Sequence, residues 1–234
     1  MNSGTVHCGP SDESITTSGG QNDRIIKSVQ IHIVSHPLAE SLLASLRNAA
    51  TGPREFRQNS EALGTILALE ATRNFPVVAT TVTTPIAETE GRNLACPLVV
   101  VPVLRAGLGM VAPFLQLFPE VAVGYIGLER NEQTAAAETY YRKLPSLAGK
   151  FCLCLDPMLA TGGSAVRAIG LMKDAGATSI KMVSIVAAPE GVAHLNSWHP
   201  DVEIFTAALD EGLDDRKYIV PGLGDFGDRL FGTF

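Results

Sequence analysis

The feature that most constrains the fold is a set of nearly continuous apolar runs of strand length. Each run is followed by loop residues and then by a helical pattern, as expected for strands buried on both faces of a parallel sheet. The sequence therefore predicts an α/β fold whose core is a parallel sheet built of βαβ units. Ligands of such sheets bind at the carboxyl ends of the strands, so functional residues are expected in the loops that follow Leu104, Leu128, Leu155 and Leu209. The runs are PLVVVPVL (97–104), FCLCL (151–155) and IKMVSIVAA (180–188).

The remaining elements follow from shorter patterns. VQIHIV (29–34) alternates like a half-buried strand, and prolines at 37 and 53 open helical segments expected at 37–50 and 53–73. The segment TTVTTPIAETEG (80–91) has the β-branched and turn residues of two strands joined by a short loop. It predicts a small β side element beside the sheet.

Composition divides the chain into two parts. Residues 1–24 are rich in Ser, Thr, Gly, Asn and Asp, with few apolar residues to offset the entropy of ordering, and are predicted to be a mobile tail. Residues 25–234 are expected to form a single domain, because no linker or internal repeat divides them.

Composition also argues against several classes of protein. The net charge of -6 does not favour a surface that binds nucleic acid, and the apolar runs fall well short of the roughly 20 residues that span a bilayer. The four cysteines lack the paired CxxC spacing of a zinc site and are predicted to be core residues of a reduced, cytoplasmic protein. They are Cys8, Cys96, Cys152 and Cys154.

The stretch LCLDPMLATGGSAVRAI (153–169) combines a strand, a glycine-rich loop and a helix. Gly162 and Gly163 let the backbone approach a ligand, and Thr161 and Ser164 add hydroxyl groups. The N-terminus of the following helix supplies unpaired N–H groups and partial positive charge, which suit a phosphate. Asp156, at the end of the strand, would accept hydrogen bonds from ribose hydroxyls. An ordinary strand-to-helix turn with an N-cap is the structural alternative.

The helix predicted after this loop has apolar residues at helical spacing, at Ala165, Ala168, Ile169 and Met172. Two other glycine-rich phosphate motifs do not fit. No Lys follows the glycines, as a Walker loop requires, and no GxGxxG follows a strand, as a dinucleotide site requires.

The order of an apolar strand, an acidic residue and LATGG(S/T) resembles the motif that binds 5-phospho-α-D-ribose 1-diphosphate (PRPP) in type I phosphoribosyltransferases. Most of that family has two adjacent acids where this chain has Asp156 and Pro157, and the DPMLATGGS form resembles uracil phosphoribosyltransferases. The resemblance implies their fold, with a central parallel sheet flanked by helices, a small β side element and a C-terminal base-binding loop. It also implies PRPP contacts from Asp156, Pro157, Met158, Leu159, Ala160, Thr161, Gly162, Gly163 and Ser164.

Two arginines follow predicted strands. Arg105 in VVVPVLRAGLGM brings a cation to the ligand edge, and Gly107 and Gly109 are expected to leave open backbone there, an arrangement that suits pyrophosphate. Arg130 begins a polar loop of about a dozen residues after the predicted strand 121–128, and loops of that length often act as lids. The alternatives are solvated surface charges. By resemblance, both arginines contact PRPP.

The C-terminal stretch YIVPGLGDFGDRLFG (218–232) contains four glycines and a proline, and is therefore predicted to be a shaped loop rather than helix or strand. Its backbone groups could read the edge of a pyrimidine, although a structural wrap of the C-terminus is the alternative. The segment resembles the uracil-binding loop of the family. The resemblance implies base contacts from Ile219, Gly224, Asp225 and Phe226, with Asp225 also near PRPP and, with Arg105, a catalytic candidate.

The resemblance covers roughly residues 31–234 and implies that uracil and PRPP react to give UMP and pyrophosphate. Mg²⁺ is expected to arrive with PRPP, with no protein ligand assigned. A homodimer or homotetramer is implied, and GTP is a candidate effector. The alternatives are a purine base as substrate, or a non-catalytic regulator that binds nucleotide or RNA. The histidines at 32, 36, 194 and 199 are expected to have surface or packing roles.

Overall fold

The computed structural model describes residues 30–130 and 137–233. In this part of the chain the centre is a nine-stranded sheet with the main strand order β1-β11-β10-β8-β4-β6-β7, and every neighbouring pair along it is parallel except β6 and β7. The predicted parallel core is confirmed, with the addition of one antiparallel edge strand. The strands on this path are β1 (Ile31–Ile33), β4 (Leu98–Leu104), β6 (Tyr125–Arg130), β7 (Ala137–Lys143), β8 (Phe151–Leu155), β10 (Ser179–Ala187) and β11 (Glu203–Leu209).

Two short strands extend this sheet. β5 (Ala122–Val123) pairs with β4, and β9 (Met158–Leu159) pairs with β10 beyond the end of β8. The strand expected at 121–128 is therefore divided into β5 and β6.

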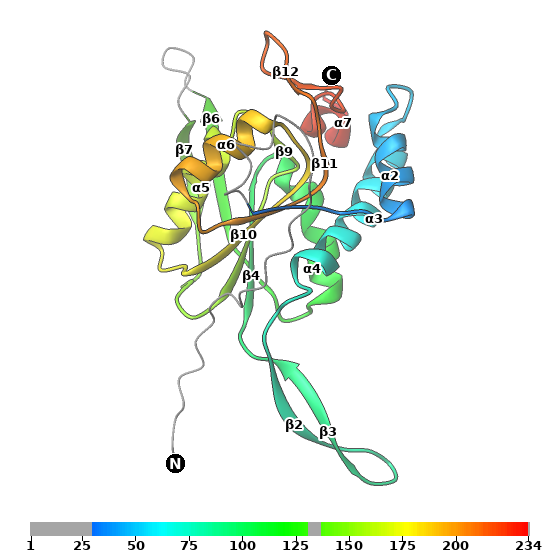
Figure 1. The fold of residues 1–234 in the computed structure, drawn as a ribbon, viewed down its shortest axis with the longest axis vertical. Helices are drawn as coiled ribbons and strands as arrows, with labels where there is room; N and C mark the ends of the chain where they lie inside the picture. The colour runs from blue at the N-terminus through cyan, green and yellow to red at the C-terminus, as the bar shows by residue number, and fades with distance from the viewer. Residues whose placement is uncertain (1–29, 131–136, 234) are drawn as a thin grey trace.

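Helices cover both faces of the sheet (Figure 1). One face packs against α2 (Pro37–Arg47), α3 (Pro53–Ala71), α4 (Val111–Leu117) and α7 (Phe226–Phe231), and the other against α5 (Gly163–Asp174) and α6 (Pro189–Trp198). Alternate residues of β8 face opposite sides, with Leu153 in one apolar cluster and Cys152 and Cys154 in the other. The three side chains are fully buried, because strands with helices on both faces place every side chain in a core.

Local signals explain where the first two helices begin. Pro37 and Pro53 occupy the first turn of α2 and α3, where their missing N–H groups cost nothing. The Nδ1 atom of His36 also accepts a hydrogen bond from the Leu38 N–H, at 3.1 Å, and so caps α2. Both helices end two or three residues earlier than predicted, at Arg47 and Ala71, since Asn48 is already extended and Thr72 leaves the helical region.

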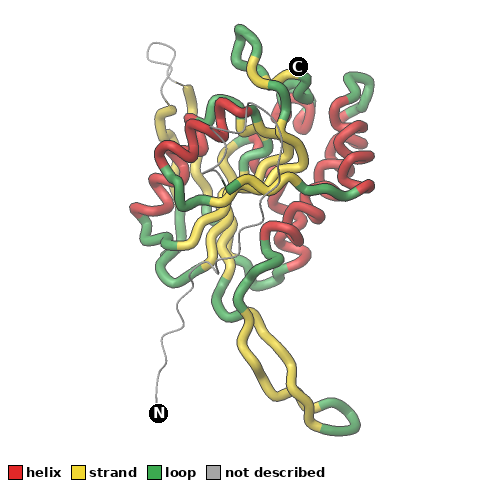
Figure 2. The backbone as a smooth tube through the Cα atoms, viewed as in Figure 1, coloured by secondary structure: helices red, strands yellow, loops and turns green. Residues whose placement is uncertain are grey.

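The predicted β side element is an antiparallel hairpin of β2 (Val77–Thr83) and β3 (Glu88–Leu94), in which Val77 pairs with Leu94 and Thr83 with Glu88. Figures 1 and 2 show it projecting from the body of the molecule as an isolated two-stranded arm. Its tip residue Ile86 is 95% exposed.

The C-terminal stretch was predicted to lack regular structure, and this prediction is wrong in part. Ile219–Val220 form β13, which pairs with β12 (Gly212–Leu213), and Phe226–Phe231 form α7. Asp225 caps α7 by accepting a hydrogen bond from the Asp228 N–H at 2.8 Å, and Phe226 and Leu230 anchor the helix in the core. Irregular backbone remains at 221–225, the segment called here the C-terminal loop.

Within the described residues, no helix combines the length and apolar character needed to cross a membrane. The predicted mobile tail, 1–24, lies outside the described residues.

Candidate active site

The predicted functional loops meet at one edge of the sheet, at the carboxyl ends of neighbouring strands. β4 and β8 are paired through Pro102 and Leu155, so Arg105 and Asp156 follow adjacent strand ends. β6 lies on the other side of β4 and ends at Arg130. In Figure 1 the C-terminal elements β12 and α7 lie at the same end of the molecule as β9.

Residues 156–164, the loop predicted to bind phosphate and called here the phosphate loop, are hydrogen-bonded to β10 over the first half of the loop. Pro157 O accepts hydrogen bonds from the N–H groups of Ile185 (3.0 Å) and Val186 (3.1 Å). β9 then continues the pairing, and Leu159 O accepts from the Ala188 N–H at 2.9 Å. These bonds fix the path of the backbone before it reaches the glycines.

The second half of the phosphate loop leaves the N-terminus of α5 without a side-chain cap. Gly162 adopts a left-handed conformation with φ of 79°, and a Cβ there would lie 2.7 Å from Gly191 O. A Cβ at Gly163 would meet only the Thr161 hydroxyl, at 3.9 Å. Space is therefore open beside Gly163, in the first turn of α5, where the N–H groups of a helix have no partners within the helix. This differs from an ordinary turn with a side-chain N-cap. The apolar positions predicted for this helix are buried, as expected, at Ala165, Ala168, Ile169 and Met172.

Asp156 is the acidic residue at the end of β8. Burial raises the pKa of its carboxyl to about 6, although a hydrogen bond from the Met158 N–H, at 3.3 Å, favours the ionised form. A carboxylate held in this way at a strand end is a strong acceptor for hydroxyl groups or a ligand for a cation.

Arg105 extends from the loop after β4, and its side chain is 63% exposed. One guanidinium nitrogen lies 3.8 Å from a carboxylate oxygen of Asp228, in the first turn of α7. Arg105 is thus an accessible cation between the phosphate loop and the C-terminal helix.

The two glycines after Arg105 serve packing rather than opening the backbone to a ligand, contrary to expectation. A Cβ at Gly107 would lie 2.5 Å from Leu155 O, and one at Gly109 would lie 2.7 Å from the Leu230 side chain. The absence of these side chains lets the Arg105 loop and the 3₁₀ helix η1 (Ala106–Met110) pack directly on β8 and α7.

Arg130 is the last residue of β6, and its side chain lies outside what the structure describes. The loop of about a dozen residues predicted from this point is wrong in length, because β7 begins at Ala137 and pairs with β6 from Arg130 onward. Gly127 accommodates this pairing, since a Cβ there would lie 2.5 Å from the ring of Tyr140.

A cavity of about 220 Å³ joins three of the predicted motifs. Of the four predicted base contacts, Gly224 and Asp225 are exposed on its wall, whereas Ile219 is 4% exposed and Phe226 is 1% exposed. The ring of Phe226 packs edge-on against Phe56 at 5.2 Å, so this residue can offer a ligand little beyond its backbone. The residues lining the cavity are Ala106, Met158, Ala160, Lys217, Tyr218, Ile219, Gly224, Asp225, Phe226 and Gly227.

Several residues that brace the site were not found from the sequence. The imidazole of His194, on α6, donates from Nδ1 to Thr161 O at 2.8 Å and so holds the phosphate loop. Arg47 and Asp210 bind Gly222 in the C-terminal loop, and Arg229 binds Leu223 O at 2.7 Å. Asp210 had one sequence signal, its position just after the strand ending at Leu209. Arg47 had none, because its partners are distant in sequence.

Known proteins resemble this chain in sequence and in fold. The family model described as uracil phosphoribosyltransferase matches residues 33–233. The uracil phosphoribosyltransferase of Roseiflexus castenholzii is 50% identical over 205 residues, covering 87% of this chain and 99% of the relative. That of Campylobacter fetus subsp. fetus is 44% identical over 204 residues, covering 87% and 98%. The solved structure of the AQ2163 protein from Aquifex aeolicus is 39% identical, with a TM-score of 0.82 over 86% of this chain and 97% of that one.

Proposed function

Because the chain belongs to the uracil phosphoribosyltransferase family, we propose that it transfers the 5-phosphoribosyl group of PRPP to N1 of uracil, giving UMP and pyrophosphate. The observation that carries this proposal is the cavity shared by the phosphate loop, the Arg105 loop and the C-terminal loop. Its volume of about 220 Å³ lies below the range for drug-sized ligands and suits a small planar base.

The phosphate loop binds the 5′-phosphate of PRPP and its ribose in this proposal. The uncapped first turn of α5 offers N–H donors and the positive end of a helix dipole, with the hydroxyls of Thr161 and Ser164 nearby in the chain. Asp156 accepts hydrogen bonds from the ribose hydroxyls. The absence of a second acid, with Pro157 in its place, leaves this role to one carboxylate.

Arg105 and Arg130 hold the pyrophosphate. As the C1′–O bond breaks, its electron pair leaves with pyrophosphate while positive charge develops at C1′. The two guanidinium groups stabilise the charge on the leaving group, and the loops position uracil N1 for bond formation at C1′. The exposed side chain of Arg105 supports this role.

The C-terminal loop and its flanking residues recognise the base through Ile219, Gly224, Asp225 and the backbone of Phe226. Asp225 has one carboxylate oxygen committed to capping α7, which fixes the direction of the side chain. The other oxygen then orients uracil or accepts the proton that N1 loses.

The residues present fit a Mg²⁺ ion that arrives with PRPP. Asp156 is a half-buried carboxylate at the strand ends, and Mg²⁺ in phosphate sites is commonly held by one or two carboxylates together with substrate oxygens and waters. Asp156 would hold the ion directly or through the ribose hydroxyls. When bound, Mg²⁺ supplies positive charge that stabilises the departing pyrophosphate.

A homodimer or homotetramer is proposed as the assembly, with the β2–β3 arm covered by a second copy. Isolated two-stranded hairpins are marginally stable, and this one exposes Val77, Val82, Ile86 and Leu94. We also propose that residues 25–234 act as one catalytic domain in the cytoplasm, consistent with the absence of disulfides at Cys152 and Cys154. GTP remains a candidate effector.

The test is to incubate the protein with PRPP and Mg²⁺ and, separately, uracil, cytosine, hypoxanthine or orotate, and to identify the nucleotide formed. UMP from uracil alone supports the proposal. A purine nucleotide would reassign the base. The absence of any nucleotide, combined with binding of UMP or RNA, would favour a non-catalytic regulator.

A further inference from the structure

The C-terminal loop makes a tight turn at Gly222, between two of the proposed base contacts, Ile219 and Gly224. Gly222 has φ of 58°, and a Cβ there would lie 2.1 Å from Ile219 O. The backbone groups proposed to read the base therefore depend on how this turn is held.

An ion pair from two distant elements binds both backbone groups of Gly222. Asp210, just after β11, accepts from the Gly222 N–H at 3.0 Å, and Arg47, at the end of α2, donates to Gly222 O at 2.7 Å. Arg47 and Asp210 are joined by two hydrogen bonds, at 2.8 and 2.5 Å. The Asp210 side chain is 3% exposed, so the pair is shielded from water on the carboxylate side.

Arg229 supplies a second brace from α7. Its guanidinium donates to Leu223 O at 2.7 Å, to Asn48 O at 2.6 Å and to Leu46 O. The carbonyls of Leu46 and Asn48 are at the C-terminus of α2 and lack partners within the helix. The turn is thus fixed to the same helix end that carries Arg47.

We propose that Arg47 and Asp210 are positioning residues that set the affinity and selectivity for the base. The inference rests on the proposed function, because it assigns the pair to the uracil site. Hydrogen bonds weaken steeply when distance and angle depart from their optimum, and discrimination between bases depends on leaving mismatched polar groups unpaired. A turn held at both its N–H and its C=O keeps the neighbouring groups in register with the base.

The experiment compares Arg47→Lys with the wild type. Lysine keeps the charge but lacks the planar fork that binds Asp210 and Gly222 together. The uracil KM is expected to rise about tenfold, with kcat and the PRPP KM changed less than about twofold, and the preference for uracil over cytosine is expected to fall.

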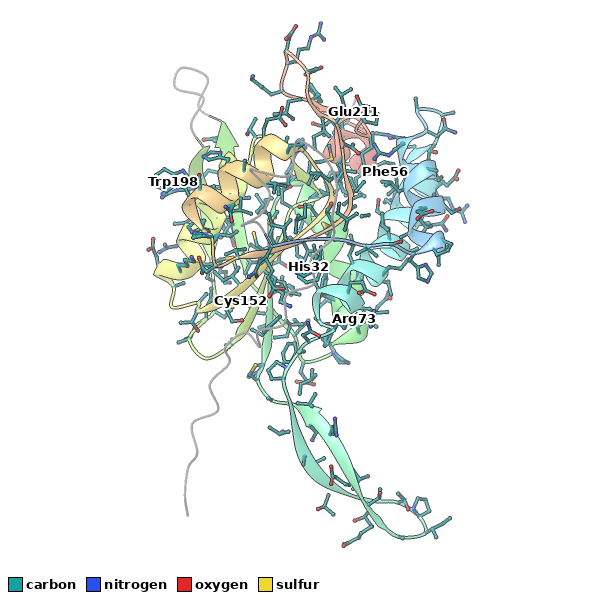
Figure 3. The ribbon with its side chains drawn as sticks, in the orientation of Figure 1. His32, Phe56, Arg73, Cys152, Trp198 and Glu211 are labelled. Atoms are coloured by element: carbon teal, nitrogen blue, oxygen red, sulfur yellow. The ribbon has the colours of Figure 1, made fainter. Side chains whose placement is uncertain are left out.

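Arg73→Lys is the matched control. Arg73 also makes a two-point contact with a carboxylate, at 2.9 and 2.5 Å from Glu70. Arg73 lies just beyond the C-terminal end of α3, whereas Phe56 lies near the N-terminal end of that helix (Figure 3). Its uracil KM should equal that of the wild type.

Asp210→Asn is the second variant, because an amide of the same shape cannot accept all three of the hydrogen bonds that Asp210 receives. It should raise the uracil KM as Arg47→Lys does. Equal increases in both substrate KM values, an unchanged uracil KM in a folded variant, or failure of both variants to fold would overturn the positioning role. A wild-type protein that makes no UMP would instead overturn the proposed function, and with it this inference.

Discussion

At the scale of single residues, ionisation of Asp156 lowers the stability of the folded state. Burial raises the pKa of its carboxyl from 3.8 to about 6, so the folded chain binds this proton more tightly than the unfolded chain. The protonated Asp156 carboxyl therefore stabilises the folded state at low pH, and this contribution to the free energy of unfolding is lost as the pH rises from about 4 to about 6. Above that window the ionised group destabilises the fold by about 3 kcal/mol.

Asp156→Asn is therefore expected to unfold at a higher urea concentration than the wild type at pH 8, with the difference vanishing near pH 4. The same variant should use PRPP poorly, because the amide removes the charge and one acceptor. Urea denaturation at both pH values checks the stability. Equal midpoints at pH 8 would contradict the assigned cost of burial.

The activity of the wild type should fall as Asp156 becomes protonated. The value of kcat/KM for PRPP reports groups of the free enzyme, and is expected to decline below about pH 6. The ratio of wild type to Asp156→Asn is the measurement, because the substrate's own phosphates titrate equally in both. A ratio that stays constant from pH 5 to pH 8 would exclude Asp156 as the titrating group.

Gly162 and Gly163 are adjacent but are predicted to respond differently to alanine. Gly162→Ala should destabilise the protein by about 1–2 kcal/mol or more, because φ is 79° and Gly191 O lies in the way. Gly163→Ala meets no backbone atom and should keep the wild-type stability, but its methyl group would obstruct a phosphate and raise the PRPP KM. Thermal melting and steady-state kinetics of both variants test this contrast. A wild-type PRPP KM in Gly163→Ala would place the phosphate elsewhere.

At the scale of elements, α6 supports the phosphate loop through two contacts. Gly191 lies against Leu159 O and Ala160 O so closely that a Cβ would be within 2.6 Å of either. His194 holds Thr161 O, and because the peptide is trans, this directs the Gly162 N–H away from α6.

His194→Ala is expected to raise the PRPP KM severalfold with little change in the uracil KM, since only the phosphate loop loses a contact. His194→Asn, whose amide can donate from a similar position, should restore much of the loss. His199→Ala is the control, because His199 Nε2 donates to Val166 O within α5, at 3.0 Å. A PRPP KM that is unchanged in His194→Ala would show that the contact with Thr161 O is not needed to hold the loop.

The helix α7 shows how a sequence signal can be outweighed. An ordinary helix start is indicated by Asp225 as an N-cap and by apolar residues at 226 and 230. The four glycines and one proline in the same stretch favoured a loop instead. Tertiary contacts decided the outcome. A Cβ added at Gly227 would lie 3.9 Å from the Ala106 side chain, so α7 packs close to η1, and Arg229 stacks at 4.5 Å over the Phe56 ring.

At the scale of the whole molecule, the β2–β3 arm carries apolar side chains that no other element of the single chain covers within the described residues. It projects from the body (Figure 2), and Ile86 and Val82 are 95% and 43% exposed. Val82→Asp combined with Ile86→Asp is expected to shift sedimentation toward the monomer, because two charges would enter the proposed interface.

Trp198→Asp is the control for the arm, since Trp198 is 66% exposed on α6, away from the hairpin (Figure 3). It should sediment as the wild type does, and repeating the measurement with GTP tests the effector proposal. Identical sedimentation of all three proteins would contradict the role of the arm in assembly.

The sequence by itself determined the features that depend on neighbouring residues. Continuous apolar runs identified β4, β8 and β10, and the order of Asp156, Gly162, Gly163 and an amphipathic helix predicted a strand, a loop and a helix that bind phosphate. These signals are local because the apolar pattern of a strand, the residues of a turn and the cap of a helix can each be read from a few neighbouring positions.

Only the tertiary structure decided how the site is held together. Arg47 and Asp210 are 163 positions apart, Arg229 and Leu46 are 183 apart, and no local pattern predicts either pair. The glycines at 107 and 109 resembled open backbone in the sequence and proved to be packing contacts with β8 and α7. The physical reason is the same in each case: a hydrogen bond or a close packing contact depends on which elements the fold brings within a few ångströms, and that is a property of the whole chain.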